Sequence, residues 1–214
     1  MHVPFPKQLI KVKKIGITNI KGGAGKTSIS ILLALLLRGK FSIVTNDIAK
    51  SLYDTDFGID VFKIDRMKRT IPKHLLKKDF MIYDMGAMSS AIDFGFVDII
   101  KNCDLIILPT KTDRNSLLAT LETYEMTRIL AQDIRIIITD FTQQKDYENA
   151  KEFLIENGYK GFIYPIKHTT LFRRLMEDGR DLFNNVHNNN GEYRLHQSLE
   201  KIKTVLERTS GYAL

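Results

Sequence analysis

The stretch "NIKGGAGKTS", residues 19–28, joins two segments of opposite character. The segment that leads into it, "KIGITNI" (residues 14–20), is short and apolar and predicts a β-strand. The segment that follows, "TSISILLALLLRG" (residues 27–39), predicts a helix that stops at Gly39. The glycines therefore lie between a strand and the start of a helix, where the backbone has to turn sharply.

This glycine loop has the chemistry of a phosphate-binding site. Glycines bring bare backbone N–H groups close to an anion, and the N-terminus of the helix adds a partial positive charge. The side chain of Lys26 can reach the β- and γ-phosphates of a nucleotide, and the hydroxyl of Thr27 can bind Mg²⁺. The stretch predicts a P-loop that binds ATP or ADP through Gly22, Gly23, Ala24, Gly25, Lys26, Thr27 and Ser28.

The rest of the chain alternates between short apolar runs and helical patterns. The runs are "FSIVTND", "DVFKI", "DFMIYD", "CDLIILP", "IRIIITD" and "GFIYPI". They lack a clean polar–apolar alternation, which is typical of strands buried on both faces. Helices are predicted at residues 90–101, 115–131, 145–157 and 170–178. This order predicts an α/β fold, a doubly wound, mostly parallel sheet with helices on both faces.

No composition shift divides the 214 residues, so we expect a single domain over residues 1–214. Its nucleotide-binding core is expected at residues 12–183, an Asn-rich loop at 184–193 and a last helix at 194–208. With one cysteine, Cys103, no disulfide can form within the chain. Neither a signal peptide nor a membrane-spanning run is apparent, so a cytoplasmic protein is expected. The net charge of +7 favours polyanionic partners.

Two carboxylates end predicted strands, at the edge where parallel sheets bind ligands. Asp84 ends "DFMIYD", and an acidic residue after an apolar strand is typical of a Walker B site. Together with Thr27, Asp84 is therefore a candidate metal ligand for Mg²⁺, directly or through water. Asp47 ends "FSIVTND" at the corresponding edge.

The loop "KGGAGKT" resembles a deviant Walker A motif, in which an extra lysine, Lys21, precedes the glycine pair. The glycine that the standard motif places five residues before Gly25 is Ile20 here. The chain thus resembles the ParA/MinD superfamily of P-loop ATPases, above all the small ParA-like plasmid partition ATPases. The resemblance spans residues 14–183. It implies a homodimer formed with ATP, in which Lys21 reaches across the interface to the phosphates of the other subunit.

The same resemblance assigns roles to several other positions. It implies that Asp47 helps to position the attacking water, so that Lys21, Lys26 and Asp47 are the catalytic candidates. Thr45 stands where the family usually has a first aspartate, so we expect weak, partner-stimulated ATP hydrolysis. Further along the chain, the resemblance implies that adenine is contacted by Thr139, Asp140 and Pro165.

The positive charge has an implied role as well, since ParA-like ATPases bind double-stranded DNA nonspecifically as ATP-bound dimers. The candidate DNA-binding residues are Lys167, Arg173, Arg174 and Arg180. The C-terminal segment "LEKIKTVLERTSGYAL" is neither strongly basic nor rich in aromatic residues, so no membrane binding is expected. A nucleoid-associated protein with a small DNA-binding adaptor that stimulates hydrolysis is the implied setting.

The leading hypothesis is an ATPase of plasmid or chromosome partition, released from DNA by ATP hydrolysis. Within the superfamily, an accessory ATPase of conjugative DNA transfer and a MinD-like protein-positioning ATPase stay open. A P-loop metabolic enzyme that phosphorylates a small carboxylate is a different class, and its turnover would depend on substrate rather than on DNA. A module that binds ATP and barely hydrolyses it is also compatible with Thr45.

Overall fold

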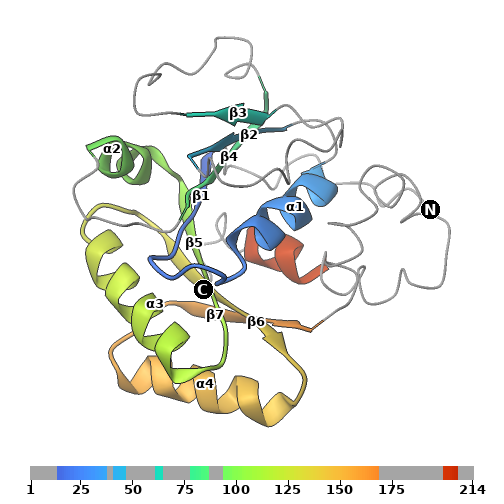
Figure 1. Cartoon of the computed structure of the whole chain (residues 1–214), viewed down its shortest axis with the longest axis vertical. Coiled ribbons are helices and arrows are strands. Elements are labelled where there is room, and N and C mark those ends of the chain that lie inside the picture. Colours follow the sequence, from blue (N-terminus) through green and yellow to red (C-terminus); the bar gives the residue numbers. More distant parts are fainter. Residues whose placement is uncertain are drawn as a thin grey trace, which may run out of the picture.

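A single sheet of seven strands lies at the centre of the computed structural model (Figure 1). The structure describes residues 14–37, 41–46, 61–64, 78–86, 94–168 and 200–206. Within these residues the strands are β1 (Lys14–Ile17), β2 (Phe41–Thr45), β3 (Val61–Lys63), β4 (Phe80–Asp84), β5 (Leu105–Thr110), β6 (Ile134–Phe141) and β7 (Phe162–Lys167). The helices are α1 (Lys26–Leu37), α2 (Phe94–Asn102), α3 (Arg114–Thr127) and α4 (Gln144–Glu156), and residues 200–206 form a further helical segment.

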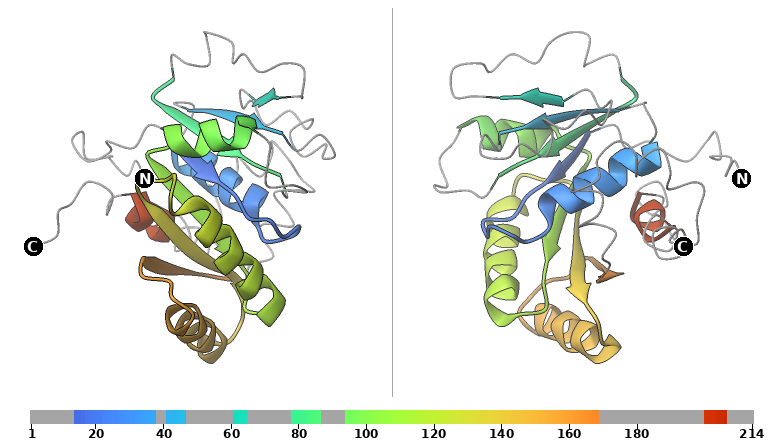
Figure 2. Two further views of the ribbon diagram at one scale, coloured as in Figure 1. Left: turned by 90° about the vertical axis from the view of Figure 1, so that its left-hand side faces the viewer. Right: turned by 45° about the vertical axis from the view of Figure 1, so that its right-hand side comes forward.

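All neighbouring strands are parallel, in the order β3-β2-β4-β1-β5-β6-β7. The predicted doubly wound α/β fold is therefore confirmed. Strand β1 is central, with β4 on one side and β5 on the other. The chain leaves β1 through α1 and leaves β5 through α3, and these two helices cover opposite faces of the sheet (Figure 2). Such a reversal opens a crevice at the carboxyl ends of the strands, where ligands of this fold class bind.

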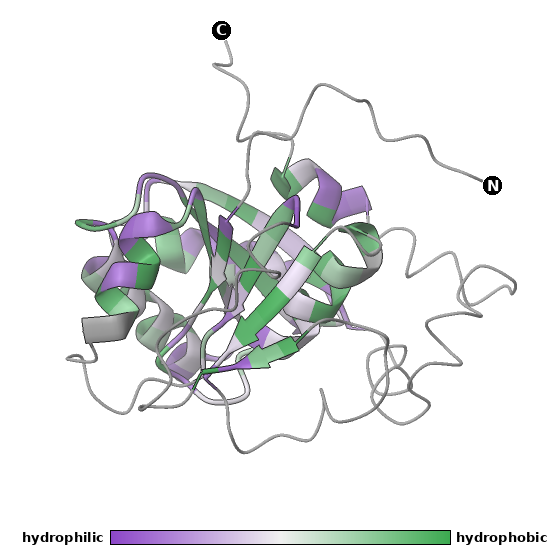
Figure 3. Cartoon of the chain, turned by 90° about the horizontal axis from the view of Figure 1, so that it is seen from above, coloured by the Kyte–Doolittle hydropathy of each residue, from purple (hydrophilic) through white to green (hydrophobic). Residues whose placement is uncertain are grey.

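The two faces of the sheet carry separate hydrophobic cores. On one face, α1 and the 200–206 segment pack on the strands, and on the other face α2, α3 and α4 do so (Figure 2). Within β5, Leu105 and Ile107 belong to the first core, whereas Ile106 and Leu108 belong to the second. Because helices cover both faces of the central strands, these strands are apolar on both faces. This explains the missing alternation in the sequence and the mostly green strands of Figure 3.

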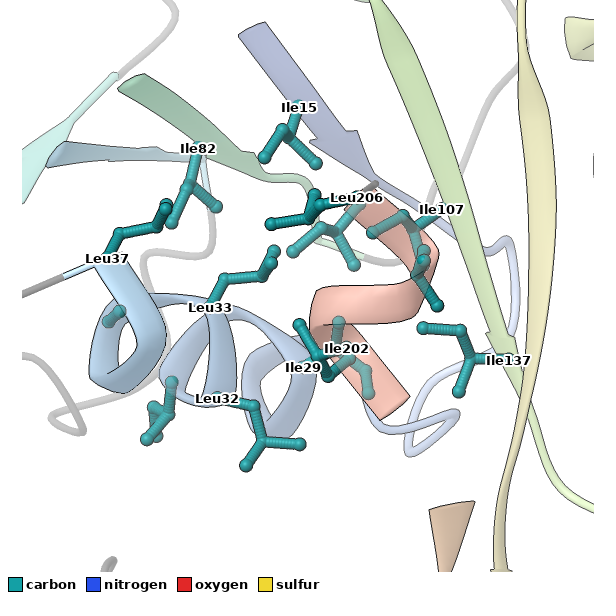
Figure 4. Close-up of a cluster of buried hydrophobic side chains, with 14 of the residues drawn as sticks. Ile15, Ile29, Leu32, Leu33, Leu37, Ile82, Ile107, Ile137, Ile202 and Leu206 are labelled. Carbon is teal, nitrogen blue, oxygen red and sulfur yellow. The ribbon is translucent and has the colours of Figure 1, made fainter. Parts of the chain in front are cut away.

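Helix α1 is apolar almost all round because it is covered twice. Leu32 and Leu33 are fully buried, and the 200–206 segment lies against α1 through Ile202 and Leu206 (Figure 4). Full burial of one leucine side chain contributes about 1.5–3 kcal/mol relative to exposure. The helix that follows the phosphate loop is thus anchored firmly, which fixes its N-terminal end against the sheet.

Some element bounds differ from the predicted ones for identifiable reasons. Strand β1 ends at Ile17 instead of residue 20, and beyond it the Asn19 side chain bonds to the Pro109 carbonyl of β5. Helix α3 ends at Thr127 instead of residue 131, where the backbone N–H groups of Leu130 and Ala131 both bond to the Thr127 carbonyl.

Several predicted segments lie outside the described residues. They are the start of the helix predicted at 90–101, the helix at 170–178, the Asn-rich loop at 184–193 and the larger part of the helix at 194–208. The domain division therefore stays a prediction. In the described part of the chain, no helix has both the length and the apolar character needed to cross a membrane.

Candidate functional site

The glycine loop connects β1 to α1 at the carboxyl edge of the sheet, beside the central strands. Gly23 and Gly25 have φ angles of 72° and 96°, in the left-handed region that favours glycine. A Cβ atom on Gly25 would lie 3.2 Å from Oγ1 of Thr139, whereas one on Gly23 would meet no atom within 4 Å. The loop therefore rests on the end of β6 at Gly25 and is open at Gly23, as a phosphate cradle has to be.

Helix α1 presents its N-terminal end to this loop. The backbone N–H of Ile29 donates the first helical hydrogen bond, to the carbonyl of Gly25 at 3.0 Å. The N–H groups of Thr27 and Ser28 precede this first bond and cannot pair within the helix. Unpaired N–H groups and the helix dipole favour an anion at this place. The loop thus fits a nucleotide phosphate.

Lys26 is buried, with 8% of its surface exposed, and its ammonium group lies inside the loop. Its Nζ atom donates to the carbonyl of Asn19 at 3.1 Å and to the carbonyl of Lys21 at 3.0 Å. An ammonium group held by carbonyl oxygens can exchange these acceptors for phosphate oxygens. The arrangement suits the predicted role of Lys26.

Asn19 organises the start of the loop, which sequence reasoning did not foresee. Its side chain is fully buried, and Nδ2 donates to the Pro109 carbonyl at 2.9 Å and to Oγ1 of Thr120 at 2.8 Å. Its Oδ1 accepts from the backbone N–H of Lys21 at 2.8 Å. The available signal was an asparagine three residues before the first glycine of the loop, since asparagine readily forms such local turns.

Lys21 lies at the rim of the loop and is held by the start of α3. Its Nζ atom donates to Oδ1 of Asp113 at 2.9 Å and to Oγ of Ser116 at 2.7 Å. Asp113 is also the N-cap of α3, because it accepts from the backbone N–H of Ser116 at 3.0 Å. The Ser116 hydroxyl donates to the Asp113 carboxylate, and this bond, followed by the one from Lys21, lowers the pKa of Asp113 to about 2.

Lys21 therefore bonds to two residues of its own chain, Asp113 and Ser116. Asp113 and Ser116 were not among the predicted site residues, although an Asp directly before a helix is a common N-cap signal. The Lys21 and Asp113 side chains are 34% and 52% exposed, so the pair lies at the surface and is screened by water.

Asp84 ends β4 next to the loop. It is 2% exposed and lies level with Ile17 of β1 and Thr45 of β2. The Thr27 hydroxyl and the Asp84 carboxylate are hard oxygen donors of the kind that Mg²⁺ prefers. Among the described residues, no cluster of three or more His, Cys, Asp or Glu side chains could hold a metal ion, so Mg²⁺ would need further oxygens from phosphates or water.

The two residues at the end of β6 point in different directions. Thr139 is buried under Gly25, and its hydroxyl donates to the Thr110 carbonyl at 3.1 Å. Asp140 is exposed, has a φ of 63° and lies at a β-bulge where the register with β7 shifts. Bulges re-aim side chains. Thr139 therefore supports the phosphate loop, while Asp140 turns toward solvent.

The Asp140 carboxylate lies between two basic side chains. It pairs with Nζ of Lys111 at 3.1 Å and contacts Nδ1 of His168. Partial burial acts to raise the pKa of Asp140, but the hydrogen bonds from His168 and Lys111 outweigh it and lower the pKa. Pro165 lies one strand away, opposite Ile138. The predicted contacts of Thr139, Asp140 and Pro165 with adenine stay predictions.

Of the predicted DNA-binding residues, the structure describes Lys167, which is exposed at the end of β7. Burial and then the charge of Lys167 lower the pKa of Lys201, which belongs to the 200–206 segment. The other DNA-binding candidates, Arg173, Arg174 and Arg180, lie outside the described residues, and so does the catalytic candidate Asp47.

Comparisons with known proteins agree with this fold and loop. Residues 15–183 match the family model of the CobQ/CobB/MinD/ParA nucleotide binding domain. A full-sequence comparison with curated proteins finds no significant match.

Solved structures of similar fold cover nearly the whole chain at low sequence identity. Apo McdA from Cyanothece has a TM-score of 0.68 and 17% identity, with 91% of this chain and 99% of that chain covered. A protein described as a plasmid partition protein of Borrelia burgdorferi, bound to AMPPNP, has a TM-score of 0.62 and 20% identity, with 91% and 98% covered. The septum site-determining protein MinD of Pyrococcus horikoshii, complexed with Mg-ADP, has a TM-score of 0.62 and 14% identity, with 92% and 98% covered.

Proposed function

Because the chain belongs to the CobQ/CobB/MinD/ParA family of nucleotide-binding domains, we propose that it is an ATPase acting as a DNA-partition switch. ATP drives two copies into a sandwich dimer, the dimer binds DNA nonspecifically, and hydrolysis releases it. One observation carries this proposal. The phosphate loop presents two lysines. Lys26 lies inside the loop, and Lys21 lies at its rim, where it forms a surface ion pair with Asp113.

The loop and the start of α1 bind the triphosphate. Residues Gly22 to Ser28 surround the phosphates with backbone N–H groups, and Lys26 exchanges its two carbonyl acceptors for phosphate oxygens. The Thr27 hydroxyl and Asp84 hold Mg²⁺, which when bound neutralises charge on the phosphates. In support, solved structures with this fold include a McdA–ATP complex and a MinD bound to Mg-ADP.

Lys21 acts across the dimer interface. A single exposed ion pair is typically worth less than about 1 kcal/mol, so releasing Lys21 from Asp113 costs little. A second cation at the transferring phosphoryl group stabilises the charge that develops there. Because the partner copy supplies this cation, dimerisation follows the nucleotide state.

Hydrolysis is slow in the isolated chain. Asp47 positions the attacking water, but Thr45 supplies no carboxylate at the end of β2. A DNA-binding adaptor protein therefore sets the rate by stimulating turnover. In support of a protein partner, one solved structure with this fold is a MinC:MinD cell division protein complex.

Nonspecific DNA binding uses a basic surface at the end of β7. Burial and then the charge of Lys167 lower the pKa of Lys201, so these two like charges act on each other. A DNA phosphate near both would offset their repulsion. Arg173, Arg174 and Arg180 extend this surface, and DNA affinity falls steeply with salt because phosphate contacts release counterions.

A second candidate function is the positioning of protein complexes. It is favoured by the similarity in fold to MinD, described as a septum site-determining protein. The same nucleotide switch would then act on a protein partner in place of DNA.

Two measurements test the proposal, the molar mass in solution and the rate of ATP hydrolysis. We expect ATP with Mg²⁺ to double the molar mass and ADP to leave a monomer. We expect duplex DNA to raise turnover further when the adaptor is present. A monomer in ATP, or turnover that requires a small carboxylate substrate, would contradict the switch. A dimer that hydrolyses ATP without binding DNA would favour protein positioning.

A further inference from the structure

The buried face of α3 carries hydroxyl groups where a core helix usually carries apolar side chains. Thr120, Thr123 and Thr127 are almost fully buried, and each hydroxyl donates to the carbonyl of the residue four positions earlier, at 2.7–2.8 Å. Threonine is a poor helix former, and such bonds slightly destabilise helices. Three such threonines on one face lower the stability of the helix, and packing alone does not explain why they are there.

Two of these hydroxyls also accept hydrogen bonds from the start of the phosphate loop. Nδ2 of Asn19 donates to Oγ1 of Thr120 at 2.8 Å, and the backbone N–H of Ile20 donates to Oγ1 of Thr123 at 3.2 Å. Each hydroxyl proton is directed at α3, so the oxygen lone pairs face the loop. Thr127 makes the same bond within α3, and no loop donor is recorded at its hydroxyl among the described residues.

The segment held in this way controls both lysines. The carbonyls of Asn19 and Lys21 are the acceptors of the Lys26 ammonium group. Lys21 follows Ile20 directly and contacts the start of the same helix. A displacement of residues 19–21 would therefore move Lys21 and would remove the acceptors that hold Lys26 in place.

We propose that Thr120 and Thr123 are positioning residues of the phosphate loop. They fix residues 19–21 on α3 and so set the place of Lys26 before a nucleotide binds. This inference rests on the proposed nucleotide binding. A change in the position of α3 would therefore also change the position of residues 19–21.

The test compares valine variants, which replace a hydroxyl by a methyl group of similar size. Thr120→Val and Thr123→Val remove the loop contacts, and Thr127→Val is the matched control on the same helix face. We expect the first two to weaken Mg²⁺-dependent binding of a fluorescent ATP analogue by about tenfold, the order of one lost hydrogen bond. Thr127→Val is expected to change the affinity less than about twofold, and Thr120→Ser and Thr123→Ser, which keep the hydroxyl, should restore it.

Urea unfolding of every variant separates positioning from a general loss of stability. If Thr120→Val, Thr123→Val and Thr127→Val destabilise the fold equally and none changes the affinity, the hydroxyls are structural and the proposal is wrong. If a valine variant fails to fold, the alanine variant at the same position is measured.

Amide hydrogen exchange without nucleotide keeps the test independent of the proposed function. Thr123→Val should increase the exchange rate of the Ile20 amide by at least about tenfold, and Thr127→Val should not. If the wild type binds no nucleotide but this difference is found, the proposed function fails while the positioning of the loop holds. Unchanged exchange at Ile20 in Thr123→Val overturns the positioning itself.

Discussion

At the scale of single residues, Lys21 and Lys26 share a loop but differ in surroundings. Lys26 is buried and bonded to backbone carbonyls, whereas Lys21 is at the surface and bonded to a carboxylate and a hydroxyl. We propose that phosphate replaces the carbonyl acceptors of Lys26, so that Lys26 responds to the nucleotide of its own chain while Lys21, in its surface pair, stays available to a second molecule.

The ion pair predicts a small acid dependence of stability. The pKa of Asp113 falls from 3.8 to about 2 on folding, so its contribution is complete above pH 4 and is lost as the pH decreases toward 2. Its size stays below about 1 kcal/mol, because half of the side chain is exposed to water.

The Asp113→Asn variant checks this dependence, since asparagine keeps the helix cap but cannot ionise. In urea unfolding between pH 5 and 2, wild type should lose slightly more free energy of unfolding than Asp113→Asn. If the free energy of unfolding falls equally with pH in the two proteins, Lys21 and Ser116 do not stabilise the ionised Asp113 side chain.

Two glycines of the loop provide a matched pair of substitutions. Gly25 has a φ of 96° and a Cβ there would lie 3.2 Å from Thr139, while a Cβ on Gly22 would meet no atom within 4 Å. Gly25→Ala should therefore lower the free energy of unfolding by about 1–2 kcal/mol, the usual cost of a left-handed alanine. Gly22→Ala should change it by less than about 0.5 kcal/mol. Equal effects in urea unfolding would argue against the loop conformation described here.

At the scale of elements, the C-terminal helical segment is tied to the sheet by one buried arginine. Arg135 of β6 is 1% exposed, pairs with Asp133 at 2.6 Å and donates to the Val205 carbonyl. Its guanidinium group also lies 5.5 Å from the centre of the Phe162 ring. The charge is thus neutralised, and the contact joins residues that are far apart in the sequence.

Removing this arginine should loosen the segment. Arg135→Met leaves the Val205 carbonyl and Asp133 without their donor, and we expect a loss of about 2–3 kcal/mol in the free energy of unfolding. Arg128→Met, which removes only an exposed pair with Glu125, should lose less than about 0.5 kcal/mol. Faster amide exchange in residues 200–206 should accompany the first substitution only, and equal losses would contradict the role of Arg135.

The elements themselves were largely predictable, because local patterns determine them. The strand–loop–helix around Lys26 and the doubly apolar strands follow from hydrophobic runs and glycine spacing. Contacts between distant segments were not predictable from these patterns. Nothing in the helical pattern of residues 115–131 indicates that Thr120 and Thr123 face Asn19 and Ile20, since sequence periodicity does not reveal which neighbour covers a helix face.

At the scale of the whole molecule, fold and charge together suggest a switch. The family match establishes the family, and the similar structures agree with the fold. The family was predicted from the glycine loop, and the fold from the alternation of apolar runs and helices. The net charge of +7 favours polyanionic partners without locating their site. The structure adds an electrostatic interaction between Lys167 and Lys201, which come from separate segments and could not be paired from the sequence.

The most direct test of the account measures binding to a nonspecific DNA duplex with ATP, with ADP and without nucleotide. The proteins compared are wild type, Lys21→Ala and Lys151→Ala, which removes a positive charge from the exposed side of α4. We expect ATP-dependent binding by wild type and Lys151→Ala, and its loss in Lys21→Ala. Equal binding by wild type in all three nucleotide states, or unchanged ATP-dependent binding by Lys21→Ala, would contradict a switch in which Lys21 acts across the dimer interface.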